Sequence, residues 1–526
     1  MKYMEIEKGI KSWFQAINPA IKRAFIPAFI FINIAFLFHT VNFMFGDHDW
    51  LYVRSPNYWS EGTFEGRPLH FVLQSLFFGG HVLPILNNIF SFAALTLSGL
   101  LLAKYWRIPI STLIYMIFAV YIAVLPYTMV WLFYAKDMLI NLSLPLIAIS
   151  GLYLAEQGKN KKSRYLCHLL AISLLYFAFA SYIAIINLVA VCLLGGLLTD
   201  YMCSKTFIEA VRRKVPAITD IIIALIIFKL NLAVVSVSSE YNTKIVTLDY
   251  LPAKLLETLT VMFTQFIVPT PFMEPKYKYL LLAVCVCGVG CALYKGGVKK
   301  VAISSLLILC MLFASKLAFF IADERGQVLA EMENFAFVPR LDFYGLAYVY
   351  AFGLALLLSY YPKKWKKVAL GLAMVVAFMS TVRDVYAQKV WKLGFDAEMK
   401  AHERIVGRLE QMPEFRVGQK YRLFQVGTLS LRKNYYREVA GEENSLDLLS
   451  TSFTPQYMSR IVYNFYYPED IFYNNAGAGD LSAKGKEFLR NAKVYPSLGS
   501  IFIDGDIVVI VLTDEGLEKA RQQIGY

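Results

Sequence analysis

The stretch "FIPAFIFINIAFLFHTVNFMFGDHDW" (Phe25–Trp50) decides the fold class of this chain. Its apolar part has the length of about 20 residues that an α-helix needs to cross the hydrocarbon core of a bilayer. Two carboxylates, Asp47 and Asp49, follow directly. Comparable apolar runs recur along the sequence, so we predict a polytopic α-helical membrane protein.

The composition agrees with this prediction. The 526 residues are 57% hydrophobic and only 17% charged, and the mean hydropathy is +0.49. The net charge of +13 comes from Lys and Arg clusters between the apolar runs, as expected where positive charge retains loops in the cytoplasm. We therefore expect contact with membrane lipid and none with nucleic acid. The seven cysteines lie in or beside apolar runs without metal or redox spacing, so we expect them to pack in helices.

The apolar runs predict about 11 transmembrane helices. Their expected bounds are roughly 24–45, 84–103, 109–126, 138–155, two helices in 166–199 split near Ala180–Ser181, 216–236, 279–294, 301–321, 341–360 and 368–382. We expect residues 66–83, interrupted by Pro68, Gly79 and Gly80, to lie at the interface or to re-enter. The basic N-terminus and an uncleaved first helix indicate a cytoplasmic start. Residues 43–69, 127–137, 237–278, 322–340 and the tail are then outside.

The composition changes after residue 383. "GFDAEMKAHERIVGRLEQM" has helical spacing with Asp396 as a candidate N-cap, and "KYRLFQVGTL" predicts a strand. "SIFIDGDIVVIVLT" predicts two strands around an Asp-Gly turn, and "DEGLEKARQQI" predicts a closing helix. We therefore predict a transmembrane domain over 1–383 and a small extracytoplasmic α/β domain over 384–526.

The acidic segment after the first helix is the main candidate site. A carboxylate at the membrane edge costs free energy outside water or a polar cavity, so Asp47 and Asp49 are functional candidates. At this depth either could act as general base on a hydroxyl that attacks the anomeric carbon of a lipid-linked sugar. Rings that could stack on a sugar follow: Trp50, Tyr52 and Trp59. Alternatively, the segment is a solvated loop with interfacial Trp and Tyr anchors.

Basic residues in the predicted outer segments could neutralise a departing phosphate. The candidates are Arg67, Lys136 and Arg340; Arg340 could instead be a snorkelling anchor. Asp137 could contact a sugar or acceptor and orient a base, or cap the helix that follows. We expect His70 to be a buried, hydrogen-bonded histidine. Asp47-His48-Asp49 offers too few oxygens for a hard cation, so we predict no metal and no other cofactor.

Several segments in order resemble the bacterial O-antigen-modifying glucosyltransferases, which are serotype-converting membrane enzymes that use polyprenyl-phosphate sugars. They are "GDHDW" (46–50), "EGRPLHFVLQSLFF" (65–78), "PILNNIFSFAALTLSGLLLAKYW" (84–106), "FVPR" (337–340) and "KLGFDAEMKAHERIVGRLEQM" (392–412). The resemblance implies a C-type glycosyltransferase fold with an acidic base in the first external loop. It also implies a sugar on undecaprenyl phosphate as donor and a surface glycan as acceptor. One departure is "ASYIAIIN" (180–187), where relatives more often carry a Tyr-Gln pair.

From these observations we predict a polyprenyl-phosphate-sugar-dependent hexosyltransferase of the bacterial inner membrane, with its tail in the periplasm. Glucose is the expected sugar, an O-antigen of lipopolysaccharide the expected acceptor, and a single base predicts inversion. The alternative is a transporter or flippase of lipid-linked saccharide. That class predicts mid-helix charges and an internal repeat; the apolar runs carry few charges, chiefly Lys229 and Lys316, and no evident repeat.

Overall fold

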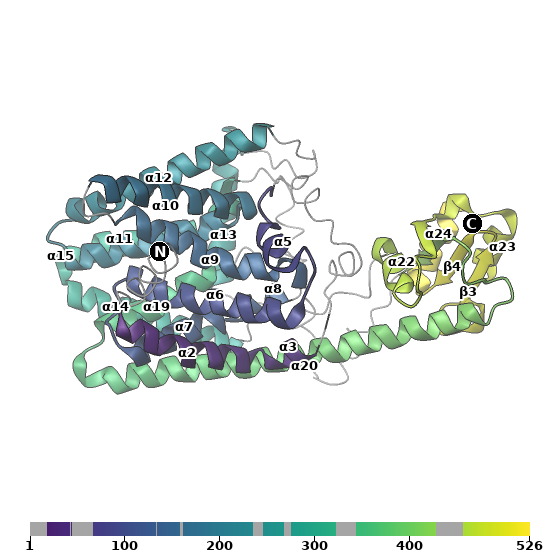
Figure 1. Cartoon of the computed structure of the whole chain (residues 1–526), viewed down its shortest axis with the longest axis horizontal. Helices are drawn as coiled ribbons and strands as arrows, with labels where there is room; N and C mark the ends of the chain where they lie inside the picture. Colours follow the sequence, from purple (N-terminus) through teal and green to yellow (C-terminus); the bar gives the residue numbers. More distant parts are fainter. Residues whose placement is uncertain are drawn as a thin grey trace, which may run out of the picture. The chain divides into compact units, whose positions relative to one another are not determined.

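The computed structural model describes residues 18–42, 44, 67–132, 134–157, 161–234, 246–267, 275–321, 343–427 and 456–526. These residues are mostly helical, with a small sheet near the C-terminus (Figure 1). The described residues within 18–41 and 67–385 belong to one compact unit, which we call the helical unit. Those from Tyr386 to Tyr526 belong to a second, which we call the tail unit.

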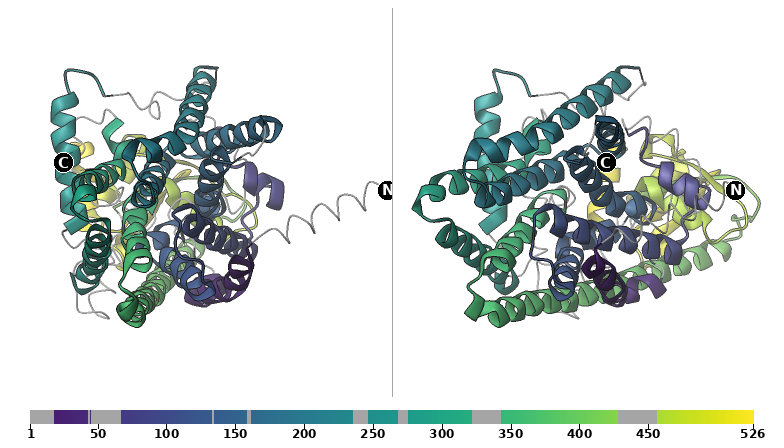
Figure 2. Two further views of the ribbon diagram at one scale, coloured as in Figure 1. Left: turned by 90° about the vertical axis from the view of Figure 1, so that its left-hand side faces the viewer. Right: turned by 60° about the vertical axis from the view of Figure 1, so that its left-hand side comes forward.

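The helical unit is a bundle of helices lying side by side (Figure 1), and the left view of Figure 2 looks along it. Its elements are α2 (Pro19–Ala35), α3 (Leu37–Val41), α5 (Val72–Phe78), α6 (Pro84–Tyr105), α7 (Thr112–Ala123), η2 (Pro126–Thr128), α8 (Met129–Leu132), α9 (Ala135–Ala155), α10 (Lys161–Ser181), α11 (Ile185–Cys203), α12 (Phe207–Val234), α13 (Leu251–Ile267), α14 (Pro275–Gly296), α15 (Val298–Ala314), α16 (Leu317–Ile321), α19 (Leu346–Tyr360), η3 (Lys363–Trp365) and the first part of α20 (Lys366–Glu410).

Seven of the described helices are long and apolar enough to cross a membrane: α6, α9, α10, α11, α12, α14 and α20. An eighth span results if α7 and the η2–α8 pair, bent by 50°, count as one. A polytopic helical protein is therefore supported, with fewer candidate spans in the described residues than the 11 expected. Two expected spans are interrupted, because Phe36 separates α2 from α3 and Ser315–Lys316 separate α15 from α16.

The expected break in 166–199 is confirmed, and the helix found in the segment 66–83 is too short to span a bilayer. The long run 166–199 divides where α10 ends at Ser181 and α11 begins at Ile185. In the interrupted segment 66–83, α5 has only 7 residues, and a bilayer-spanning helix needs about 20. In Figure 1, α5 and α8 lie at the same end of the bundle.

Two other expectations are wrong. Residues 237–278, expected to be a loop, contain α13; its buried stripe includes Lys254, Thr258 and Gln265, so a hydropathy average does not reveal it. The last transmembrane helix, expected to end near residue 382, continues as α20 to Glu410, although the compact units divide at Val385/Tyr386, close to the predicted domain boundary. Although the composition changes after residue 383, α20 contains no proline that would break the helix. Asp396 is not an N-cap but accepts a 2.6 Å hydrogen bond from Lys392.

Small residues bring α14 and α19 into close contact. A Cβ atom added to Gly288 would overlap the carbonyl oxygen of Gly353, and one added to Gly353 would overlap Cys285. Such small-residue contacts let backbones approach where lipid supplies no hydrophobic driving force between helices. Glycine at these two positions therefore sets the spacing of the helix pair.

A buried ion cluster joins α9, α11 and α12. Lys214 Nζ lies 2.8 Å from Glu156 Oε1 and 3.0 Å from Asp200 Oδ2, and Arg107 also pairs with Asp200. Lys214 and Asp200 are almost completely buried. Buried charges in a membrane protein need such partners, so this cluster is explained as a structural link between helices.

The tail unit is an α/β domain. Its elements after α20 are β1 (Tyr421–Val426), α22 (Gln456–Asn464), β2 (Phe472–Asn475), η4 (Ala478–Asp480), α23 (Ala483–Asn491), η5 (Leu498–Ser500), β3 (Ile501–Asp504), β4 (Ile507–Val511) and α24 (Asp514–Gln523). The sheet order is β2-β1-β4-β3, with β1 parallel to β2 and β4, and β3 antiparallel to β4. Asp504 pairs with Ile507 across a two-residue turn in which Gly505 has φ 64°. The predicted strands, hairpin and closing helix are confirmed.

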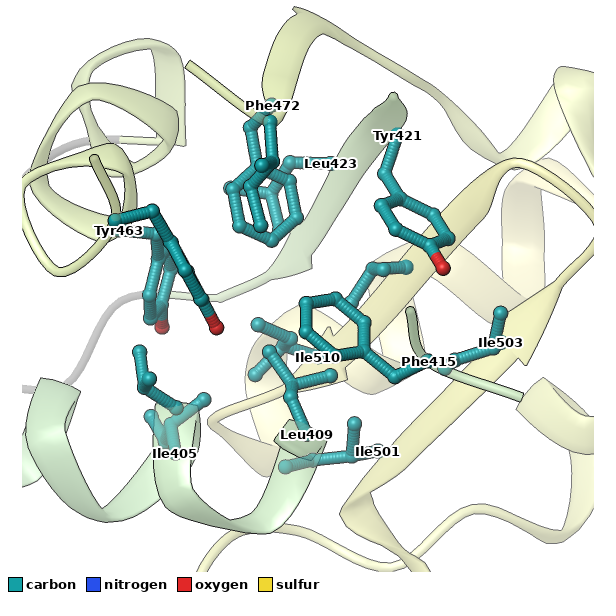
Figure 3. Packing of buried hydrophobic residues seen from close by; sticks show 14 of the residues in the cluster. Ile405, Leu409, Phe415, Tyr421, Leu423, Tyr463, Phe472, Ile501, Ile503 and Ile510 are labelled. Carbon is teal, nitrogen blue, oxygen red and sulfur yellow. The ribbon is translucent and has the colours of Figure 1, made fainter. Parts of the chain in front are cut away.

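Apolar side chains cover both faces of this sheet. On one face, Ile405 and Leu409 of α20 point toward Tyr463 of α22 and Tyr421 of β1 (Figure 3). On the other face, Phe424 and Val426 of β1 and Ile507, Val509 and Val511 of β4 pack with α23 and α24. Successive strand residues alternate between the two clusters, as pleated strands require. The end of α20 is thus part of the tail core.

Candidate functional site

The residues that precede α5 dock on the C-terminal end of α10. Leu69 N donates to Ala180 O at 3.2 Å, and His70 Nδ1 lies 2.8 Å from Ser181 O. The last four carbonyl groups of a helix have no partner within the helix. Leu69 and His70 satisfy two of them where α10 stops, which fixes this segment beside the break between α10 and α11.

His70 also contacts the first turn of α9. Its Nε2 atom lies 3.0 Å from Asp137 Oδ1, and both residues are buried. Asp137 is the acidic residue of the first turn, where a negative charge is favoured by the helix dipole. The Asp137 side chain therefore pairs with His70. It does not cap α9, because Tyr134 occupies the N-cap position. The expectation of a buried, hydrogen-bonded His70 is confirmed.

The hydrogen bonds determine where protons lie in this pair. A carbonyl oxygen only accepts, so the Nδ1 atom that faces Ser181 O carries a hydrogen. Nε2 and Oδ1 can then bond only if one further proton lies between them, on the ring or on the carboxyl group. The His70–Asp137 pair consequently holds a proton at a defined position beside the start of α9.

An arginine and several aromatic rings adjoin the pair. The Arg67 guanidinium lies 4.9 Å from the ring centroid of Tyr182, a cation–π distance. Trp131 meets the Tyr182 ring edge-on at 5.6 Å. Tyr344 lies 5.7 Å from Tyr182, and its hydroxyl is 2.9 Å from Asn141 Oδ1. This aromatic group joins the α10–α11 break to the residues before α19.

The structure brings together only part of the predicted site. Arg67 and Asp137 are linked through His70 and the end of α10, whereas Lys136 has only its backbone described, in the first turn of α9. The following predicted residues lie outside the described parts of the chain: Asp47, Asp49, Trp50, Tyr52, Trp59 and Arg340. The prediction that no metal binds at Asp47-His48-Asp49 falls on the same segment.

Sequence reasoning did not identify Trp131, Asn141 and Tyr344 as members of this group. One signal was present, because Asn141 follows Asp137 by four residues in an otherwise apolar helix and shares its face. Tyr182 lies in "ASYIAIIN", the turn at which the sequence departs from the family it resembles.

Comparison with known proteins adds no assignment: no family model, curated protein or solved structure matches the chain. The resemblance to O-antigen glucosyltransferases therefore stays a prediction.

Proposed function

We propose that this chain is a membrane glycosyltransferase that moves a hexose, with glucose expected, from undecaprenyl phosphate to a surface polysaccharide such as O-antigen. The observation that supports this most directly is the buried His70–Asp137 pair beside Arg67. The backbone carbonyl oxygen of Arg67 accepts from His70 N at 3.0 Å. The proposal therefore combines a candidate base, Asp47 or Asp49, with the cation of Arg67 and the proton held by the His70–Asp137 pair.

In the proposed reaction, Asp47 or Asp49 takes the proton of the acceptor hydroxyl. The hydroxyl oxygen bonds to the anomeric carbon while the bond from that carbon to the phosphate oxygen breaks, which inverts the configuration. The phosphate departs with the bonding electron pair, and Arg67, with Lys136 and Arg340, offsets its charge. Trp50, Tyr52 and Trp59 would contact the sugar or acceptor. No metal or cofactor is part of this scheme.

Asp137 takes a different part from the one expected from sequence. Because its Oδ1 atom is bonded to His70, we assign it to positioning in place of direct sugar contact. It holds the His70 ring, which in turn holds the segment that carries Arg67 against Ser181.

The same proposal includes the C-type glycosyltransferase fold with 11 spans, a cytoplasmic N-terminus and a periplasmic tail unit. A reporter fused to the C-terminus tests the orientation in bacterial cells. We expect it to register the periplasm. A cytoplasmic signal would place the tail on the opposite side from the proposed acceptor.

A transporter or flippase of lipid-linked saccharide is the second candidate. A partly buried ionisable pair outside the Lys214 cluster favours it: Asp220 of α12 lies 2.8 Å from His168 of α10. Charges inside helical membrane proteins often mark transport pathways. Sugar transfer by purified protein in detergent, where no second compartment exists, separates the two functions because a transporter gives no product.

The test of the enzyme proposal uses purified full-length protein and a panel of polyprenyl-phosphate sugars with a polysaccharide acceptor. Asp47→Asn and Asp49→Asn are assayed separately, with Asp396→Asn as the matched control from a partly exposed ion pair on α20. We expect one of the first two changes to lower transfer roughly 10²–10⁴-fold and the control to retain it. Full activity in both single variants would remove the proposed base.

A further inference from the structure

An apolar groove with one cation lies along the surface of α12. Its volume is about 400 Å³, and its lining residues share one face of the helix: Ile222, Leu225, Ile226, Lys229 and Leu230. Ile222, Ile226 and Leu230 are 52%, 54% and 64% exposed, so the groove is open along its length. From Ile222 to Leu230 the helix rises about 12 Å.

This face of α12 is available to lipid. α12 is a candidate membrane span of 28 residues, and only 22% of its apolar stretch is buried within the protein, compared with 72% for α9 and α11. Side chains that a spanning helix does not bury in protein meet the hydrocarbon of the bilayer. A groove lined by Ile and Leu at this surface therefore suits a hydrocarbon chain.

Lys229 is the charged residue of the groove. It is exposed, and it makes no hydrogen bond or ion pair with any residue that the structure describes. Its neighbours one turn away along α12 are Leu225, Ile226, Leu232 and Ala233, so its own helix supplies no acidic partner. An ammonium group at a lipid-facing surface costs free energy unless it reaches water or an anion. A lipid phosphate is such an anion.

The position of Lys229 along α12 places it within reach of lipid phosphates. Arg213 lies near the basic start of the helix, and Lys229 follows it by 16 residues. These residues rise about 24 Å, whereas the hydrocarbon core is about 30 Å thick. With Arg213 at one boundary of the core, Lys229 lies roughly 6 Å from the other, and a lysine that snorkels brings its ammonium group to the phosphates there.

α12 runs in the same direction as α10, beside which it lies (Figure 1). His168 of α10 pairs with Asp220 of α12. Further along both helices, Asn231 Nδ2 donates to the Tyr176 hydroxyl oxygen at 2.9 Å. The C-terminal ends of the two helices therefore lie at the same end of the bundle.

The charged end of the groove points toward the candidate site. Lys229 lies two residues before Asn231, and Ser181, which faces His70, lies five residues beyond Tyr176. Along the helix axes, Lys229 is therefore only about 10 Å from the level at which His70 meets α10. A lipid held at Lys229 occupies the leaflet nearest to the candidate site.

We propose that this groove binds the polyprenyl phosphate carrier of the sugar donor, with its chain on Ile222, Ile226 and Leu230 and its phosphate at Lys229. The chain is wholly apolar like the lining, and the phosphate compensates the lysine charge. One helix face suits a single chain better than the two chains of a phospholipid. Identifying the lipid as the donor carrier rests on the proposed function, whereas the groove and its cation do not.

The test is native mass spectrometry of full-length protein in detergent, with undecaprenyl phosphate and phosphatidylglycerol added separately. Lys229→Leu removes the charge, and Lys229→Arg retains it. Lys299→Leu, at an exposed lysine in the first turn of α15, is the matched control. We expect Lys229→Leu to weaken binding of undecaprenyl phosphate about tenfold or more, Lys229→Arg to retain most of the affinity, and the control to bind like the wild type.

A second pair of variants tests the groove without changing a charge. Ile226→Trp places a bulky ring in the groove and should also weaken binding. Ile227→Trp, at the next position, which is exposed but does not line the groove, should leave binding unchanged. Thermal unfolding identifies a variant that does not fold, and the other lining position then decides.

Three results would overturn the proposal. The first is binding like the wild type by folded Lys229→Leu or Ile226→Trp protein. The second is equal or tighter binding of phosphatidylglycerol, which would assign the groove to bulk phospholipid. The third is a dimer that excludes lipid, which would assign this face to a second copy of the chain.

Sugar transfer measured on the same proteins separates the groove from the enzymatic proposal. If the wild type binds the carrier through Lys229 but transfers no sugar, the groove stands and the transferase function fails. If the wild type transfers sugar while Lys229→Leu binds the carrier normally, the function stands and the groove fails.

Discussion

His70 Nε2 and Asp137 Oδ1 lie 3.0 Å apart, although 67 positions separate the residues in the sequence. The opposite ring nitrogen of His70 faces the carbonyl oxygen of Ser181 at 2.8 Å. One imidazole therefore ties together the segment before α5, the first turn of α9 and the end of α10. Its orientation is fixed from both sides, so a change at Asp137 should disturb the whole arrangement.

Asp137→Asn should lower sugar transfer roughly 10²-fold, the size of effect that a misplacement of about 1 Å can cause. The amide nitrogen can still donate to Nε2, but the amide does not ionise, so the pair loses its titratable carboxyl group. Steady-state kinetics over a range of pH checks this, because a positioning residue that holds a proton should change the pH profile as well as the rate.

A second His–Asp pair, which is partly buried, supplies the control. His168 Nδ1 lies 2.8 Å from Asp220 Oδ2, between α10 and α12. Asp220→Asn removes a comparable contact and should leave the rate and the pH profile of transfer unchanged. An equal loss in both variants would mean that breaking either His–Asp pair in this unit disturbs the enzyme.

Changes at Tyr182 test the contact with Arg67. Tyr182→Phe keeps the ring under the guanidinium, 4.9 Å away in the wild type, and should retain most of the activity. Tyr182→Leu removes the ring and should weaken donor binding, seen as a raised KM, since a cation–π contact contributes about 0.5–2 kcal/mol. Equal kinetics for the Phe and Leu variants would show that the ring has no part in placing Arg67.

Local patterns predicted the parts of the fold that depend on nearby residues. The length of run 166–199 required a break, and α10 does end at Ser181. Strand alternation and the Asp-Gly turn indicated the β3–β4 hairpin, where Gly505 adopts the positive φ that such turns require. At the α10–α11 break and at the β3–β4 turn, the residues that form the sequence pattern are also the residues that determine the local structure.

The remaining features depend on contacts between distant segments. The hydroxyl of Tyr344 meets Asn141 across 203 positions, and no local pattern pairs these residues. The polar buried face of α13 reads as a loop in a hydropathy average because its buried residues include Lys254 and Gln265. These side chains are buried only because α14, α16 and α19 cover them, which is a tertiary cause.

The close approach of α14 and α19 can be tested with two glycines on one helix. Gly288→Ala should destabilise the helical unit by about 1–3 kcal/mol, because the new Cβ overlaps the backbone of Gly353. Gly290→Ala is the matched control, since a Cβ there has no atom within 4 Å, and it should be neutral or slightly stabilising. Thermal unfolding of the full-length protein in one detergent compares them, and equal midpoints would contradict the packing argument.

A surface contact in the tail unit predicts a pH dependence. Arg422 Nε donates to Asp506 Oδ2 at 3.0 Å, joining the starts of β1 and β4, and Tyr473 donates to the same oxygen at 3.2 Å. The hydrogen bond from Arg422 is the main reason that the pKa of Asp506 is below its usual value of 3.8. The stabilisation is therefore fully present above pH 3.8 and is lost as the pH falls through the lower pKa of the folded state.

Asp506→Asn should consequently cause a small increase in hydrogen exchange of β1 and β4 near neutral pH, and no increase at a pH below the folded-state pKa. The effect is small because the carboxylate is partly exposed and screened by solvent. Arg422→Gln provides the control: in that background the Asp506 substitution should have little further effect, since the partner is gone. If Asp506→Asn increases hydrogen exchange equally in the Arg422→Gln background, or still increases it below the folded-state pKa, the increase comes from the turn backbone and not from the ion pair.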